Sequence, residues 1–170
     1  MTLVIGVDPG GTTGICALWI THDPLIVENP INSIEVIQCD GEGRTARIAV
    51  IMVVNALIAR ATLENEREVI LSVESFVVGM RAAKSRHSGA GKQARDIIAD
   101  LYNMRNVWRV SHPAVVVKKW ATDERLDKAG IMTATTGMRH ARDAGRHALF
   151  AAVKGGHMPD PLSRKQTPAL

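Results

Sequence analysis

The feature that most constrains the fold of this chain is a buried strand at residues 3–8 that ends in an acid. Residues 3–7 are short, apolar and rich in β-branched side chains, and Asp8 follows them directly before Pro9-Gly10-Gly11. Such a run is typical of a strand covered on both faces, and Pro-Gly ends it. A carboxylate there is unfavourable unless it is paired or bound to a metal. Asp8 is therefore either a side chain that caps the turn or part of a functional site.

The remaining apolar runs predict a sheet with helices on both faces. Further strands are expected at 14–20, 34–38, 69–73 and 107–110, and helices at 44–61, 91–104, 138–153 and after Pro113, with a charged, exposed stretch at 123–130. Three strands in a meander, followed by alternating helices and strands, predict an α/β fold of the RNase H-like class. Its mixed five-stranded sheet would combine a three-stranded antiparallel meander with parallel strands.

Composition indicates one domain. The chain has 170 residues, 46% of them hydrophobic, which suits a single core over residues 1–157, followed by a disordered tail at 158–170. No apolar run reaches the ~18 residues of a membrane span, and the first residues do not resemble a signal peptide. We therefore expect no membrane association, a cytoplasmic location, and two reduced thiols at Cys16 and Cys39.

Two further features favour a functional site at Asp8. Glu74 ends a second buried strand, and parallel neighbouring strands would place both carboxylates at one edge of the sheet. Glu74 alone could equally be a solvated strand-end acid. In the last predicted helix, His140, Asp143 and His147 share one stripe about 60° wide, because successive residues are about 100° apart. That stripe alone could be a polar helix face with local hydrogen bonds.

An oxygen-rich cluster of this kind suits a hard cation. Carboxylates bind Mg²⁺ or Mn²⁺, and two ions ~3.5–4 Å apart can activate water and stabilise the leaving oxygen in phosphodiester cleavage. Asp8 would be the natural bridging ligand. His140 could be a ligand or could position the water, and the sequence leaves both roles open.

Charge is divided unevenly along the chain. Residues 1–75 carry four Lys or Arg against ten Asp or Glu, whereas residues 76–170 carry seventeen against seven. The second half would therefore face a polyanion such as DNA, or simply be a solvated basic surface. The candidate contacts include a basic, glycine-containing loop at 78–92 and the short helix after Pro113, namely Arg81, Lys84, Arg86, Lys92, Lys118 and Lys119.

Four motifs in this order resemble the RuvC-like Holliday junction resolvases over residues 3 to about 153. They are Ile5-Gly6-Val7-Asp8-Pro9-Gly10-Gly11-Thr12-Thr13-Gly14, Val73-Glu74-Ser75-Phe76, Pro113 with Val117-Lys118-Lys119, and His140-Ala141-Arg142-Asp143-Ala144. The resemblance implies a bacterial or phage homodimer that binds a four-way junction and makes paired nicks with Mg²⁺. It implies that Asp8, Glu74, His140 and Asp143 form the catalytic and metal-binding set. Phe76 would stack on a base or pack in the core.

We place the dimer surface around Ile97, Ile98 and Leu101, on the helix after the basic loop. Three other functions remain as alternatives. An RNase H-like nuclease could act on flaps, forks or RNA–DNA hybrids, and a catalytically inactive protein could bind junctions, although the acid set is intact. A sugar-kinase or chaperone-type ATPase shares the Asp8 loop, but needs a second domain and a second phosphate loop.

Overall fold

The computed structural model describes residues 1–23, 29–64, 68–75 and 89–163. Its elements are β1 (Thr2–Asp8), β2 (Thr12–Ile20), β3 (Ile31–Asp40), α1 (Gly43–Leu63), β4 (Glu68–Ser75), α3 (Gly89–Tyr102), β5 (Trp108–Pro113), α4 (Ala114–Trp120), α5 (Asp123–Lys128), α6 (Ile131–Ala134) and α7 (Arg139–Lys154). All the strands and helices that the sequence predicted are present, with ends shifted by a few residues.

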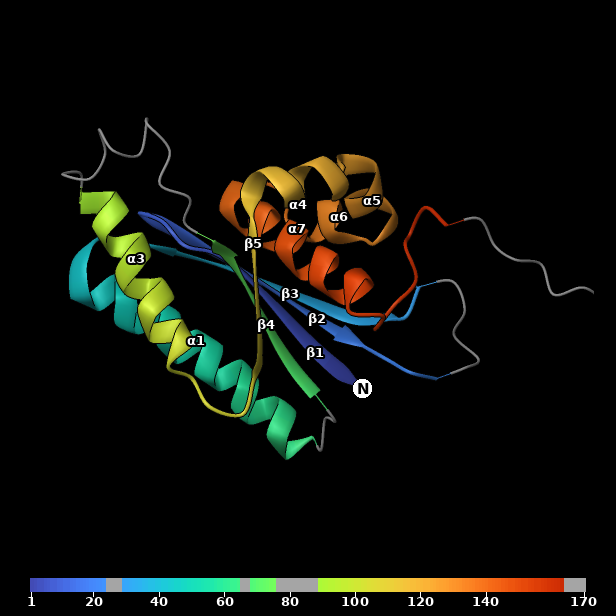
Figure 1. Ribbon diagram of the computed structural model, residues 1–170, viewed down its shortest axis with the longest axis horizontal. Coiled ribbons are helices and arrows are strands. Elements are labelled where there is room, and N and C mark those ends of the chain that lie inside the picture. Colours follow the sequence, from blue (N-terminus) through green and yellow to red (C-terminus); the bar gives the residue numbers. More distant parts are fainter. Residues whose placement is uncertain (24–28, 65–67, 76–88, 164–170) are drawn as a thin grey trace, which may run out of the picture.

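The sheet has the order β3-β2-β1-β4-β5 (Figure 1). β1 pairs antiparallel with β2 and β2 antiparallel with β3, while β1, β4 and β5 are parallel. β1 lies at the centre, which explains its unbroken apolar run, because a central strand is covered on both faces. The predicted RNase H-like architecture is confirmed.

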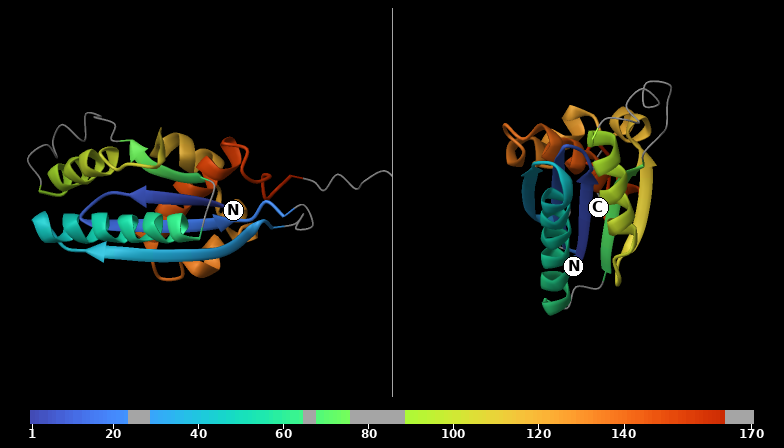
Figure 2. Two further views of the ribbon diagram at one scale, coloured as in Figure 1. Left: turned by 90° about the horizontal axis from the view of Figure 1, so that it is seen from below. Right: turned by 90° about the vertical axis from the view of Figure 1, so that its left-hand side faces the viewer.

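Two helical layers cover the sheet. Figure 1 shows α1 and α3 on one side of the sheet and α4 to α7 on the other, and in Figure 2 α1 runs lengthwise along the strands. Alternate β1 side chains point into the two layers. Leu3 and Ile5 pack with α1 and α3, whereas Val4 packs with α7. The period-2 geometry of a strand thus divides the core into two clusters.

The segment after α4 differs from the expectation of an exposed charged stretch. Residues 123–128 form helix α5, which buries Leu126, and the short helix α6, not predicted, buries Ile131. The predicted disordered tail is also corrected at its start, because Met158 is buried in the core and Asp160 pairs with Arg125 at 3.0 Å. Residues 158–163 therefore pack against the domain, and 164–170 lie outside the described residues.

The predicted dimer surface on α3 is wrong. Ile97 and Leu101 are fully buried against the sheet and α1, and Ile98 is half-buried beside them. Their apolar spacing therefore belongs to the core. In the described part of the chain α1 alone is long and apolar enough to cross a membrane, and its Val50 and Val54 are buried against the sheet.

Candidate active site

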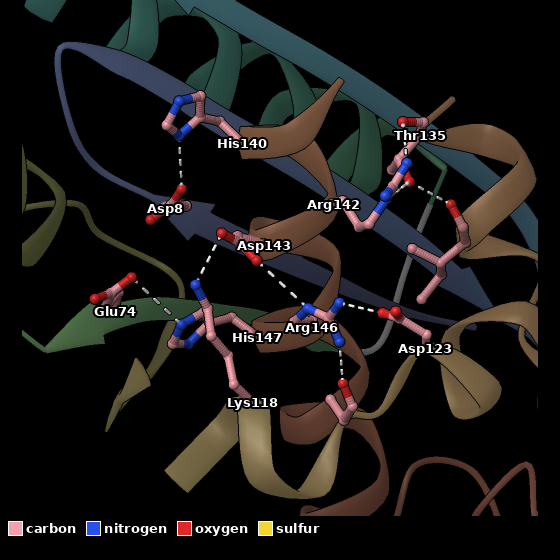
Figure 3. Close-up of polar contacts among 12 residues, drawn as sticks. Asp8, Glu74, Lys118, Asp123, Thr135, His140, Arg142, Asp143, Arg146 and His147 are labelled. Carbon is pink, nitrogen blue, oxygen red and sulfur yellow. Dashed lines mark hydrogen bonds and ion pairs between the residues drawn. The ribbon is translucent and has the colours of Figure 1, made fainter. Parts of the chain in front are cut away.

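Asp8 and Glu74 lie side by side at one edge of the sheet. The parallel register pairs Val7 with Val73, so the two strands reach their terminal acids together. The two carboxylates are therefore adjacent, as the two strand ends predicted (Figure 3).

Two glycines bring α7 against the ends of the strands. A Cβ on Gly6 would lie 2.0 Å from the carbonyl oxygen of Ala144, and one on Gly14 would lie 2.0 Å from that of His140. Any larger residue would push the helix away. This close approach places the first turns of α7 over β1 and β2, next to Asp8.

His140 is held at both its backbone and its ring. The Gln38 side-chain oxygen on β3 accepts hydrogen bonds from the backbone N–H groups of His140 at 2.9 Å and Ala141 at 3.3 Å. These N–H groups have no intrahelical partner at a helix N-terminus. The His140 Nδ1 atom lies 3.1 Å from Asp8 Oδ2. Gln38 therefore fixes the helix end from which the imidazole reaches Asp8.

Asp143 is engaged by two cations. Its Oδ2 lies 2.9 Å from Lys118 Nζ of α4, and its Oδ1 lies 3.4 Å from Arg146 Nε, one turn further along α7. Arg146 also binds the Asp123 carboxylate and the Ala121 carbonyl. Asp143 is thereby held on the side of α7 that faces α4 (Figure 3).

His147 lies behind Glu74. Its side chain is 1% exposed, and its Nε2 is 3.8 Å from Glu74 Oε2. Neither ring nitrogen has a hydrogen-bond partner among the described residues. Burial, together with the nearby charge of His112, lowers the pKa of His147 to about 4, so the ring is neutral at pH 7.

The acids at the sheet edge crowd one another. Burial, a hydrogen bond with Asp8 and the charge of Asp8 raise the pKa of Glu74 to about 7. Burial and the charge of Asp143 also raise the pKa of Asp8, offset in part by the hydrogen bond with Glu74. A divalent cation would relieve this repulsion and satisfy the carboxylate oxygens, so this donor set fits Mg²⁺ or Mn²⁺.

The side chains as they stand do not surround one point. Over the described ranges, no three His, Cys, Asp or Glu side chains gather closely enough to hold one ion. Instead, Asp8 faces His140, Glu74 faces His147 and Asp143 faces Lys118. An ion bound by Asp8, Glu74 and Asp143 would require Asp143 to turn away from the lysine.

Comparison of the fold with solved structures gives matches along almost the whole chain. RuvC of T. thermophilus in complex with a Holliday junction substrate has a TM-score of 0.54 at 16% identity, covering 92% of this chain and 96% of that one. The chain has a RuvC-like fold. A second Thermus thermophilus RuvC structure matches with a TM-score of 0.49 and 18% identity, covering 90% and 96% of the two chains.

A Fowlpox virus resolvase in complex with Holliday junction DNA also matches, with a TM-score of 0.48 and 12% identity over 89% of this chain and 97% of the other. No family model matches the sequence, and no curated protein sequence does. The RuvC-like fold thus rests on structure, where 16% identity is compatible with the same arrangement of elements.

The predicted DNA contacts fall in different places in this RuvC-like fold. Lys118 is bound to Asp143, and Lys119 is exposed on the same helix. Lys92, at the start of α3, lines a hollow of about 600 Å³ beside Arg44 and Arg47. The other four residues, Phe76, Arg81, Lys84 and Arg86, lie outside the described residues.

Several positioning residues were missed in the sequence. Gln38 gave no signal beyond being a polar residue near the end of a strand. Gln93 joins the turns of the same sheet edge, accepting from Gly43 N–H at 2.9 Å and donating to the Gly41 and Gly10 carbonyls. His147 was grouped with His140 on one stripe, but its burial against Glu74 depends on the crossing of α7 over β4.

Proposed function

We propose that this chain is a divalent-metal-dependent endonuclease that resolves four-way DNA junctions by paired nicks. The observation that carries the proposal is the adjacency of Asp8 and Glu74 at one edge of the sheet, with His140 at Asp8 and Asp143 close enough to raise the pKa of Glu74. The support from comparison is the fold shared with the T. thermophilus RuvC that is bound to a Holliday junction substrate. A buried, mutually repelling acid set in that fold needs a cation and suits phosphodiester hydrolysis.

Asp8, Glu74 and Asp143 would hold Mg²⁺, with Mn²⁺ as a substitute, and His140 stands beside them. The metal would supply an activated water and charge stabilisation for the leaving oxygen, in a two-ion arrangement. His140 keeps its Nδ1 toward Asp8 at 3.1 Å. With Nδ1 engaged by Asp8, Nε2 would be the ring nitrogen left free to accept a proton.

The homodimer is part of this proposal, with a new surface. One side of α1 is exposed and carries no charge over Ile48, Met52, Ala56, Ala59 and Leu63, and Met52 is 66% exposed. The stripe follows a helix about 30 Å long at 1.5 Å per residue. A two-fold axis would bring the same stripe of a second copy against it and remove this apolar surface from water.

The dimer is tested separately from cleavage. Wild-type protein should sediment as a dimer at micromolar concentration, and Met52→Glu should sediment as a monomer. Ala99→Glu, exposed on α3, is the control and should stay dimeric. A monomeric wild type at tens of micromolar would exclude the dimer, whatever the nuclease assay shows.

The nuclease itself is tested on a panel of four-way junction, flap, fork and linear duplex DNAs with Mg²⁺ or Mn²⁺. We expect symmetric paired nicks near the branch point of the junction, no cleavage by Asp8→Asn, and unchanged junction binding by that variant. Asp127→Asn, an exposed acid on α5, is the matched control and should cut normally. Preferential cleavage of flaps or forks would assign another branched substrate, and cleavage by Asp8→Asn would exclude this site.

A further inference from the structure

A hollow with positively charged walls lies on the far side of Asp143 from Asp8. It measures about 560 Å³, and α4, α7 and the residues at the start of α5 line it. Four of its lining residues are basic, namely Lys118, Arg139, Arg142 and Arg146, and two are acidic, Asp123 and Asp143. The balance of charge in the hollow is therefore positive.

Arg146 neutralises part of the acidic charge. Its side chain is 13% exposed, and it binds Asp123 and lies 3.4 Å from Asp143. The hydrogen bond and charge of Arg146 lower the pKa of Asp123, which keeps this carboxylate ionised and paired. Arg146 therefore lines the hollow in a fixed position, and its charge is already paired with these two carboxylates.

The charges of Arg139 and Arg142 are not paired with a carboxylate of the described residues, so both side chains can bind an anion. Arg139 is exposed and forms no hydrogen bond or ion pair with any described residue, although its charge acts at longer range to lower the pKa of Asp8. Arg142 makes two long contacts of 3.4 Å, from Nε and Nη2 to the hydroxyl and carbonyl oxygens of Thr135. These contacts hold the guanidinium in place (Figure 3), while its Nη1 has no partner in the described chain. A guanidinium fixed in this way presents free N–H donors in a rigid fork, the geometry that fits a phosphate.

We propose that this hollow binds a backbone phosphate next to the one that is cut, with Arg139 and Arg142 as its ligands. This inference rests on the proposed nuclease function and adds a subsite to it. The hollow shares Lys118 and Asp143 with the acid cluster, so a strand whose phosphate lies at the acids continues directly past the two arginines. Their role is to fix the register of the strand, since phosphate contacts position DNA without reading its sequence.

The test measures junction binding by fluorescence anisotropy in EDTA over a series of salt concentrations. Because each lost phosphate contact reduces the salt slope by about one, Arg139→Gln and Arg142→Gln should each reduce it by about one, and the double variant by about two. Arg105→Gln removes an exposed arginine between α3 and β5, at the opposite end of the parallel strands, and should leave the slope unchanged. At low salt with Mg²⁺, the arginine variants should raise KM and keep kcat.

Circular dichroism establishes that each variant is folded, and Arg139 is exposed, so its removal leaves the packing of the domain unchanged. An unchanged salt slope in the double variant would overturn the subsite. So would a loss of kcat at saturating DNA, which would place the arginines in the chemistry. Failure of the nuclease proposal is seen elsewhere, as no junction cleavage by the wild type or as cleavage by Asp8→Asn, and the binding assay in EDTA does not depend on cleavage.

Discussion

Lys118 Nζ lies 2.9 Å from Asp143 Oδ2, so a lysine holds one of the carboxylates of the proposed metal site. The lysine also lowers the pKa values of Asp8 and Glu74, although burial outweighs it at both. The Lys118 ammonium thus supplies, beside the acid cluster, the positive charge that a bound metal ion would otherwise supply. Metal binding would have to displace it, and the freed lysine would then face the DNA backbone.

We therefore expect Lys118→Gln to bind Mn²⁺ a few-fold more tightly than wild type at pH 8.5, where protons no longer compete for the acids. The size follows from the ~0.2–1 kcal/mol of a partly exposed ion pair. Junction binding should weaken in the same variant. Isothermal titration measures the metal affinity, with Lys119→Gln on the same helix as the control. Weaker metal binding by Lys118→Gln would show that the lysine organises the site rather than competing for it.

The fold was predictable because its signals are local. The buried run before Asp8 and the one before Glu74 identified two central strands, and the order of elements then left few topologies. The dimer surface was not predictable in the same way. Ile97 and Leu101 have the spacing of an apolar helix face, and spacing alone does not tell whether a core or a partner covers that face.

The site was only partly predictable, because its supporting contacts join distant segments. Asp8 and Glu74 follow from strand ends. By contrast, Gln38 reaches His140 across 102 positions of sequence, and Lys118 reaches Asp143 from another helix. Such contacts depend on how closely α7 approaches the sheet, and that distance is set by the absence of side chains at Gly6 and Gly14.

Gln38 should matter for both stability and catalysis. Gln38→Met removes the acceptor of the first α7 N–H groups, and loss of a helix cap costs about 0.5–2 kcal/mol. Urea unfolding measures this change. Gln38→Glu restores an acceptor and should recover most of the stability. If Gln38→Met unfolds like wild type, solvent replaces the cap and Gln38 does not position His140.

Gly14→Ala adds a single methyl group but should displace the active-site residues of α7. The added methyl would lie 2.0 Å from the His140 carbonyl oxygen, so α7 must move. Overpacking of this kind costs about 1–3 kcal/mol, and the displaced His140 and Asp143 should greatly reduce cleavage. Gly137→Ala is the control, because its Cβ would meet nothing within 4 Å and only its φ of 76° is strained. It should lose some stability and keep cleavage.

His147 should act through Glu74. His147→Leu removes the ring whose Nε2 lies 3.8 Å from Glu74 Oε2. We expect metal binding to weaken about 10–100-fold, because the ring would close to hydrogen-bond distance of this carboxylate when an ion is bound and the variant would lose that outer contact. His147→Gln, which can place an amide N–H near the same position, should recover part of the affinity. Titration with Mn²⁺ reports this directly, and the unfolding midpoint shows whether packing has changed. Equal metal affinity in His147→Leu and wild type would make the histidine a packing residue only.

The raised pKa of Glu74 predicts a pH dependence of stability in metal-free protein. Between its usual value of 4.5 and about 7, the unfolded chain has lost this proton and the folded chain keeps it, so the free energy of unfolding falls as pH rises. Glu74→Gln cannot ionise and should lack this fall. His147 has the opposite effect on the free energy of unfolding in both proteins, so the difference between wild type and variant reports the contribution of Glu74. Urea unfolding from pH 4 to 8 in EDTA measures the difference. Mg²⁺ should reverse the loss in wild type, most strongly above pH 7, where no proton must be released. Parallel profiles for wild type and Glu74→Gln would contradict the crowded acid pair.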